Sequence, residues 1–193
     1  MKTPFEHFKS DISVVQIDKN LYQGNISDMW SIGKTPNGGY TMALAAKAIS
    51  ESLEHKDPLI VTANYLNRLN FGKIDIKVET LPSTRSLSSA RATMIQDNEI
   101  KVIFTATFTD LSKATGLNKA FKKEPIFEKY EDCHLHAFKE GFNPGLEKFI
   151  EKKYCSDSIW WKAKDNNQNK NAVLNLYMSV SYTHLRAHET INH

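Results

Sequence analysis

Residues 35–57 read TPNGGYTMALAAKAISESLEHKD, and this stretch determines how the rest of the chain is interpreted. Its first residues are typical of a helix start, because Thr35 or Asn37 can cap the first turn and two glycines follow. From there on, apolar residues recur three and four positions apart and leave only a narrow polar strip. The pattern predicts a mostly buried helix from Gly39 to about Leu53.

The hydrophobic period changes from 3.6 to 2 residues after Asp57 and Pro58. Residues 73–80 alternate cleanly between apolar and charged side chains, and Asp97-Asn98 is typical of a tight hairpin turn. With one or more strands before the helix, this order predicts an α+β fold in which an antiparallel sheet wraps around a central helix, the hotdog arrangement. We expect antiparallel strands near residues 59–69, 73–81, 84–97 and 99–110.

The chain beyond residue 110 predicts a second domain that is not finished. Residues that follow the last strand are polar and rich in lysine, which is typical of a linker. Further on, Asp157–Lys164 is interpreted as a strand, and Asn171–Ser179 as a second apolar element for which a helix is one interpretation. We therefore expect a first hotdog repeat at 1–110, a linker at 111–138, the start of a truncated second repeat at 139–179, and a non-native tail at 180–193.

Composition excludes several classes of protein. The chain has 193 residues, of which 40% are hydrophobic and 24% charged, and its net charge of +3 is too small to favour nucleic acid or an anionic membrane as partner. The amino-terminal segment lacks the apolar run of a signal peptide, and no run is long enough to span a membrane, so we expect a cytoplasmic protein. Two cysteines are too few for a disulfide framework, and a reducing compartment would keep both as thiols.

The carboxyl-terminal segment VSYTHLRAHET, residues 180–190, resembles one reading frame of a transposase-based sequencing adapter at all eleven positions. His184 and His188 stand four residues apart and could share a helix face as metal ligands, but the adapter match outweighs that interpretation. Non-native segments are excluded before the fold is considered. We therefore expect the native residues to end near Ser179 and the native gene to continue beyond them.

Several segments in register resemble the thioesterase-like family related to acyl-CoA thioesterase II, whose chains are two fused hotdog repeats. The first is WSIGKTPNGGY at 30–40, and the others follow it in the family's order. The resemblance is good over about residues 20–110 and loose over 140–179. One departure is that Leu69 follows Arg68, where the family often has proline. The other segments are VTANYLNRLNFG at 61–72, VETLPSTRSLSSARATMIQDNE at 78–99 and IFTATF at 103–108.

The resemblance implies hydrolysis of a fatty acyl-CoA thioester to the free acid and CoA, without a metal or another cofactor, and a homo-oligomer for the intact parent. In the family, a catalytic Asp lies on the helix of the second repeat, after a segment like VLNLYMS at 173–179. Here the next residue is Val180, the first of the adapter-like segment. The resemblance therefore implies that this chain lacks the catalytic Asp and is inactive as it stands.

The glycine-opened helix start suits thioester chemistry on physical grounds. A thioester carbonyl needs an oxyanion stabiliser, and free backbone N–H groups at a helix amino terminus provide one. Asn37, Gly38, Gly39 and Tyr40 are the candidate oxyanion and substrate-binding residues, although a capped turn into a packed helix explains the same motif.

Basic and metal-binding residue types give weaker signals. Arg68 and Arg85 could contact the CoA phosphates or could be solvated surface charges. Cys133, His134 and His136 are metal-ligand types, but they lack a second cluster, so no metal site is predicted.

Two other functions are alternatives to hydrolysis. The first is a hotdog module that binds acyl-CoA without hydrolysis, or that only serves as a scaffold. The second is a hydratase-type hotdog, which would require His or Asp on the first helix, and residues 38–53 contain neither.

Overall fold

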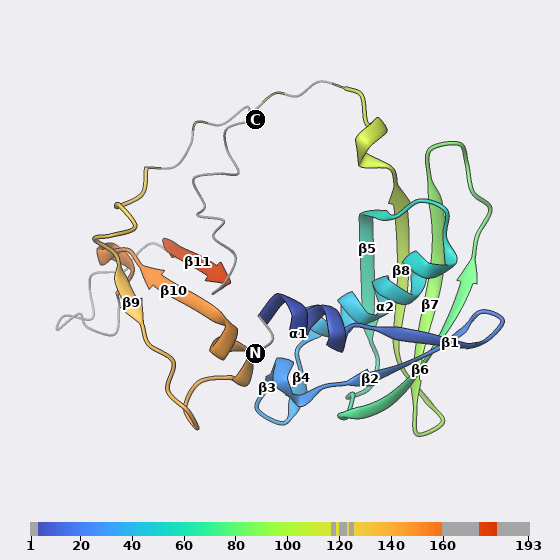
Figure 1. Cartoon of the computed structure of the whole chain (residues 1–193), viewed down its shortest axis with the longest axis horizontal. Helices are drawn as coiled ribbons and strands as arrows, with labels where there is room; N and C mark the ends of the chain where they lie inside the picture. The colour runs from blue at the N-terminus through green and yellow to red at the C-terminus, as the bar shows by residue number, and fades with distance from the viewer. Residues whose placement is uncertain (1–3, 117–118, 120–122, 124–125, 160–173, 181–193) are drawn as a thin grey trace. The chain divides into compact units, whose positions relative to one another are not determined.

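The computed structural model describes residues 4–116, 119, 123, 126–159 and 174–180. The chain divides into two compact units, one of residues 6–117 and one of residues 118–193 with 1–5. We call them the first and second units and describe each by itself (Figure 1).

The central helix of the first unit is α2 (Gly38–Ser52), within one residue of the predicted helix at both ends. Asn37 is its N-cap, and its side chain accepts hydrogen bonds from the first turn. The helix is buried on the stripe that the apolar spacing predicts, since Leu44, Ala48 and Ile49 have no exposed surface.

A six-stranded antiparallel sheet packs on α2 (Figure 1). Its order is β1-β2-β6-β7-β8-β5, so β2, which precedes the helix, pairs with β6, and β1 and β5 are the edge strands. This arrangement confirms the predicted α+β hotdog fold. The strands are β1 (Val14–Asp18), β2 (Leu21–Ile26), β5 (Asp57–Tyr65), β6 (Gly72–Thr80), β7 (Ser88–Gln96) and β8 (Glu99–Thr109).

Short elements complete the first unit. Helix α1 (Pro4–Asp11) precedes β1, and η1 (Asp28–Trp30), β3 (Ser31–Ile32) and β4 (Thr35–Pro36) connect β2 to α2. A last 3-10 turn, η2 (Leu111–Lys113), follows β8.

The turn between β7 and β8 has the predicted hairpin chemistry. Asp97 and Asn98 both have positive φ, at 56° and 61°. Two successive positive φ values define a type I′ turn, and Asn and Asp tolerate that backbone region better than most residues.

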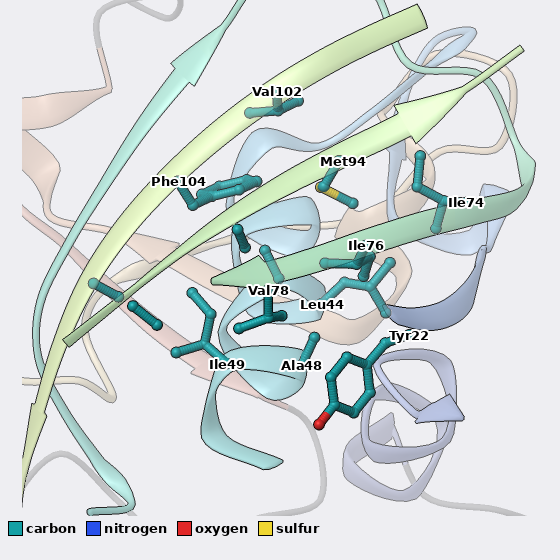
Figure 2. Close-up of a cluster of buried hydrophobic side chains, with 14 of the residues drawn as sticks. Tyr22, Leu44, Ala48, Ile49, Ile74, Ile76, Val78, Met94, Val102 and Phe104 are labelled. Carbon is teal, nitrogen blue, oxygen red and sulfur yellow. The ribbon is translucent and has the colours of Figure 1, made fainter. Parts of the chain in front are cut away.

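The core of the first unit forms where the helix stripe meets the inward-facing positions of β6, β7 and β8 (Figure 2). Ile76, Met94 and Phe104 are fully buried, one on each of these strands. Each fully buried side chain of this size stabilises the folded state by about 1.5–3 kcal/mol. Trp30 is half-buried and packs against this cluster.

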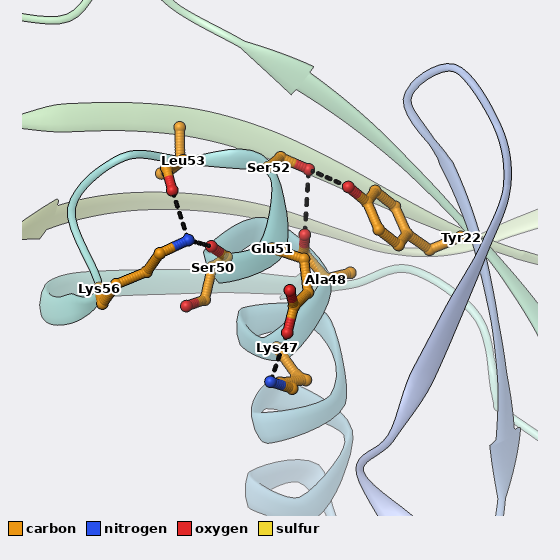
Figure 3. Close-up of polar contacts among 8 residues, drawn as sticks. All are labelled: Tyr22, Lys47, Ala48, Ser50, Glu51, Ser52, Leu53 and Lys56. Carbon is orange, nitrogen blue, oxygen red and sulfur yellow. Dashed lines mark hydrogen bonds and ion pairs between the residues drawn. The ribbon is translucent and has the colours of Figure 1, made fainter.

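Polar contacts fix the carboxyl-terminal end of α2 (Figure 3). The Lys56 ammonium donates to the carbonyls of Ser50 and Leu53, both at 2.6 Å, which satisfies two carbonyls at the helix end. The Ser52 hydroxyl lies 2.9 Å from that of Tyr22 on β2. The helix is therefore tied to the sheet at this end.

The second unit contains a three-stranded antiparallel sheet in the order β11-β10-β9. The 3-10 turns η3 (Gly145–Phe149) and η4 (Ser156–Ser158) flank the central strand. The strands are β9 (His134–His136), β10 (Ile150–Tyr154) and β11 (Leu176–Val180).

The second unit differs from three sequence-based expectations. Residues 176–180 form a strand, so the helical interpretation of Asn171–Ser179 is wrong there; short apolar runs do not distinguish the two structures. The predicted strand Asp157–Lys164 begins within a 3-10 turn, and its residues 160–164 lie outside the described residues. Strand β9 lies inside the segment predicted as a linker.

The predicted boundary of the non-native tail falls at the end of β11. Val180 is its last residue, and its backbone pairs with that of Ile150. Residues 181–193, to which the rest of that prediction applies, lie outside the described residues. Within the part of the chain that the structure describes, no helix is both long and apolar enough to cross a membrane.

Candidate functional site

The amino terminus of α2 carries the four predicted oxyanion residues, and the structure shows how their N–H groups are used. The Asn37 side chain accepts from the N–H groups of Gly39 at 2.9 Å and Tyr40 at 3.2 Å. The Asn37 N–H donates to the Trp30 carbonyl at 2.8 Å. Among the described residues, no acceptor contacts the Gly38 N–H. Gly38 therefore offers the helix dipole and an available donor at one position.

Tyr65, at the end of β5, fixes the backbone of Gly38. Its hydroxyl donates to the Gly38 carbonyl at 2.6 Å, and the Thr41 hydroxyl donates to the same oxygen at 2.9 Å. A Cβ atom at Gly38 would lie only 3.0 Å from the Tyr65 hydroxyl oxygen. The close approach explains a small residue here, since a larger one would displace the tyrosine.

An open groove of about 360 Å³ lies beside this helix start. It is formed by the segment before α2, the first turn of α2 and the chain that follows β5. Its lining is mainly apolar or uncharged, with one guanidinium group and no carboxylate or imidazole among the described lining residues. The lining residues are Thr35, Pro36, Thr41, Tyr65, Leu66, Asn67, Arg68 and Leu69.

The Tyr40 side chain belongs to the core rather than to the groove. Its ring is 3% exposed and its hydroxyl accepts from the Ser27 N–H and donates to the Asp11 carbonyl, both at 3.0 Å. Burial raises the pKa of this phenol, so it stays neutral. Only the backbone N–H of Tyr40 could take part in oxyanion stabilisation.

The two predicted phosphate-binding arginines lie at opposite ends of the sheet. Arg68 lines the groove, and its guanidinium donates to the Lys34 carbonyl at 2.8 Å. Arg85 lies in the loop that joins β6 to β7, while Arg68 precedes the start of β6. Because β6 spans nine residues, about 30 Å, the structure does not bring the two arginines together. Only Arg68 lies near the helix start.

The second unit brings together two residues that the sequence did not pair. The Sγ atoms of Cys133 and Cys155 lie 3.6 Å apart, and both side chains are buried. Their ligand atoms and that of Glu128 lie within 4.8 Å of one another. His134 is exposed, and His136 lies beside Glu147. Neither histidine therefore joins Cys133 in the metal-binding cluster that their residue types suggested. The pairing of β9 with β10 brings the two cysteines together. Their separation of 22 residues along the chain did not indicate this contact.

Comparisons with known proteins find similarity in the first unit. The family model of the acyl-CoA thioesterase N-terminal domain matches residues 26–109. A thioesterase-like protein of Talaromyces wortmannii, TwmA, is 30% identical over 92 residues, which are 46% of this chain and 26% of that protein.

Solved structures share the fold at low sequence identity. A proposed thioesterase II from Thermobifida fusca has a TM-score of 0.72 at 19% identity, over 79% of this chain and 57% of its own. A hotdog protein of unknown function from Alicyclobacillus acidocaldarius scores 0.68 at 19% identity, over 82% and 59%. An acyl-CoA thioesterase II from Mycobacterium marinum scores 0.59 at 12% identity, over 77% and 52%.

The chain spans about a quarter of its curated relative and less than three-fifths of these solved chains. The sequence match, the six-stranded sheet and the central helix all fall in the same unit. Residues 26–109 therefore match the acyl-CoA thioesterase N-terminal domain, within a unit that has the hotdog fold.

Proposed function

We propose that this chain is part of an acyl-CoA thioesterase, which hydrolyses a fatty acyl-CoA thioester to the free acid and CoA. The observation that carries the proposal is the match of residues 26–109 to the acyl-CoA thioesterase N-terminal domain. A groove beside the amino terminus of α2 supports it, because this is where a thioester carbonyl would meet a backbone donor.

The proposed role of the helix start is to stabilise the oxyanion. Water attack on the thioester carbon places negative charge on the carbonyl oxygen, and a donor that is already aimed at that oxygen lowers the barrier. Gly38 is the strongest candidate, since its N–H has no acceptor among the described residues. The N–H groups of Gly39 and Tyr40 would first have to leave the Asn37 side chain.

Arg68 and an apolar neighbour are proposed to bind the CoA phosphate and the methylene groups of the substrate. A guanidinium group binds phosphate oxygens in a bidentate manner, so Arg68 at the groove could hold a CoA phosphate. Leu66, which is exposed, offers apolar surface for methylene groups beside it. Arg85, at the other end of the sheet, would have to contact a different part of the ligand.

We also propose that the general base lies outside this chain. Hydrolysis needs a group that takes a proton from water, and carboxylate or imidazole side chains are the usual ones. The described lining residues of the groove include neither. The resemblance to the family implies an Asp on the helix of the second repeat, at or beyond position 180, so the chain as given is expected to bind substrate without turning it over.

An alternative is a hotdog module that binds acyl-CoA or serves as a scaffold. The capping of two donors by Asn37 favours it, because those N–H groups are already satisfied. Catalysis by the longer gene product distinguishes the two functions.

The test measures release of the CoA thiol from acyl-CoAs of increasing chain length. Residues 1–179 are compared with the longer product of the native gene. We expect turnover by the longer protein alone, since loss of a general base typically costs about 10²–10⁴ in rate. Fast turnover by the short chain would place the base within it, and ligand binding without turnover by the longer protein would favour the alternative.

Two substitutions at one position test the oxyanion role in the longer protein. Gly38→Pro removes the proposed donor, and proline is well tolerated at the first position of a helix. Gly38→Ala adds the same Cβ near Tyr65 but keeps the N–H. We expect the proline variant to lose about 10²–10³ in kcat and the alanine variant to lose far less. Equal losses in kcat would mean that the space beside Tyr65 limits activity at Gly38, and not the backbone N–H donor.

A further inference from the structure

The two cysteines of the chain are cross-strand neighbours in the second unit. Strands β9 and β10 are antiparallel, with Tyr154 opposite His134 at the end of their pairing. Cys155 follows Tyr154, and Cys133 precedes His134. The same register therefore places the two cysteines opposite each other. Their Sγ atoms lie 3.6 Å apart.

Directly opposite residues of an antiparallel pair have Cα separations of about 4.5–5.5 Å. Disulfides occur at Cα separations of about 4.4–6.8 Å. Opposite positions in this register therefore suit a disulfide, and the sulfur atoms must approach by roughly 1.5 Å to reach a bond of about 2.05 Å.

The thiol pair also accounts for most of the side chains that the described part of the second unit buries. Among its described residues, the buried side chains are those of Cys133, Cys155 and Ser158. Small units that bury little apolar surface commonly depend on a covalent or metal cross-link. The cross-link would close a loop between residues 22 positions apart, which removes conformational freedom from the unfolded chain.

We propose that Cys133 and Cys155 form a reversible disulfide that joins β9 to β10, a modification site separate from the thioester chemistry of the first unit. This differs from the expectation, drawn from a reducing compartment, that both remain thiols.

A metal ion explains the cluster less well. Structural zinc sites use four protein ligands, and the described residues supply three, from Glu128 and the two cysteines. The Glu128 carboxylate is already engaged, because it accepts from the Ser156 N–H at 2.6 Å and from the Ser156 hydroxyl at 2.9 Å. The two thiols, in contrast, lie next to each other and can still form a covalent bond with each other.

The oxidant is a small-molecule disulfide such as oxidised glutathione. The Cys133 thiolate attacks one sulfur of that disulfide, which forms a mixed disulfide and releases one glutathione thiolate. The Cys155 thiolate then attacks the Cys133 sulfur and releases the second glutathione. The two protein thiols lose two protons and two electrons, and one oxidised glutathione is reduced to two thiols.

The native state slows this exchange. Burial, with the neighbouring Cys155 thiol, raises the pKa of Cys133 to about 11, so little thiolate exists at neutral pH. Cys133 immediately precedes β9, an edge strand of three residues, and opening of this strand exposes the thiol. Exchange therefore proceeds through local opening and becomes faster as the pH rises.

The experiment incubates the full chain with oxidised glutathione, followed by intact mass and thiol alkylation. We expect a product that has lost two hydrogen atoms, carries no glutathione and no longer reacts at either cysteine. Amide exchange in peptides that cover β9 and β10 should become about ten-fold slower or more, with no change in β6–β8. Persistent mixed disulfides on both cysteines, or unchanged exchange after closure, would overturn the proposal.

Variants assign the two steps. Cys155→Ser should stop at a mixed disulfide on Cys133, and Cys133→Ala should not close, whereas His134→Ala, in the exposed neighbour, should close as the parent does. Because the parent chain is compared with itself before and after oxidation, the test holds even if a cysteine variant folds poorly. Stoichiometric binding of added Zn²⁺ that protects both thiols and resists oxidised glutathione would instead assign the pair to a metal site.

Discussion

Among the residues that the structure describes, the two units of this chain differ strongly in how many side chains they bury. In the first, a 15-residue helix packs on six strands, and residues such as Leu44, Ile76 and Phe104 have no exposed surface. In the second, three short strands bury a pair of thiols and one serine among the described residues. Burial of apolar surface is the main favourable contribution to folding, so the first unit has the stronger independent basis for stability.

The difference also explains where sequence patterns are informative. The spacing of apolar residues indicates a helix or a strand only where one face of that element is buried. The first unit has such faces on α2 and on β6 to β8, whereas β10 is half-buried along its whole length. Substitutions at paired positions in the two units test this contrast.

Phe104→Ala should have the largest effect on the first unit. The ring is fully buried and meets Tyr65 edge to face, with centroids 6.3 Å apart. Truncation of such a residue costs about 3–5 kcal/mol in the free energy of unfolding, measured by urea denaturation. Leu135→Ala is the control in the second unit, since Leu135 is 53% exposed on β9 and should change stability by less than about 0.5 kcal/mol. Comparable losses would contradict the contrast between the units.

Tyr40→Phe should have an intermediate effect. The variant keeps the buried ring but leaves the Ser27 N–H without its acceptor, which costs about 1–3 kcal/mol. Tyr177→Phe is the matched control, because its hydroxyl donates to the Glu128 carbonyl at a half-buried position where water can replace it. Thermal unfolding of both variants measures the difference, and a larger loss at Tyr177 would show that polar burial matters more in the second unit.

The sequence predicted the helix and its following strands to within a few residues, because their patterns arise from burial on one face. Asn37 could be identified as a cap and Asp97-Asn98 as a hairpin turn, since both depend on local backbone chemistry. The order of strands could not be predicted: β6 pairs with β2, about 50 residues earlier, and nothing local encodes that choice.

The site was predicted only in part. The helix start was found from Asn37 and the two glycines, but the use of their N–H groups depends on side-chain conformation that no pattern reveals. Tyr65 was missed because it lies 27 residues from Gly38 and reads as an ordinary strand residue. The pairing of Cys133 with Cys155 was missed because it needs the register of β9 on β10. Contacts between distant residues were thus the part that sequence could not supply.

Asn37→Ala should destabilise the first unit by about 1 kcal/mol, in a range of about 0.5–2 kcal/mol. The substitution leaves the N–H groups of Gly39 and Tyr40 without the side-chain acceptor that caps α2. Asn37→Asp keeps an accepting oxygen and adds a negative charge at the positive end of the helix, so it should retain the stability of the parent. Urea denaturation separates the two variants; equal losses would mean that the amide nitrogen, and not the capping oxygen, matters.

The smallest effect is expected for Glu51→Gln on the exposed side of α2 (Figure 3), where Lys47 pairs with Glu51 one turn later. A hydrogen bond from Lys47 and its positive charge hold the pKa of Glu51 below its ordinary value of 4.5. Because the folded-state pKa is the lower one, the pair stabilises the protein above about pH 4.5, and this contribution is lost as the pH falls through the folded-state pKa.

Exposed pairs one turn apart contribute only about 0.2–0.5 kcal/mol. Glu51 also lies near the negative end of the helix, which reduces the benefit of its charge. Thermal unfolding at neutral pH should therefore show a loss within that range for Glu51→Gln, and the difference from the parent should vanish in acid and at high salt. A difference that persists in acid would mean that Glu51 stabilises α2 through packing rather than through its charge.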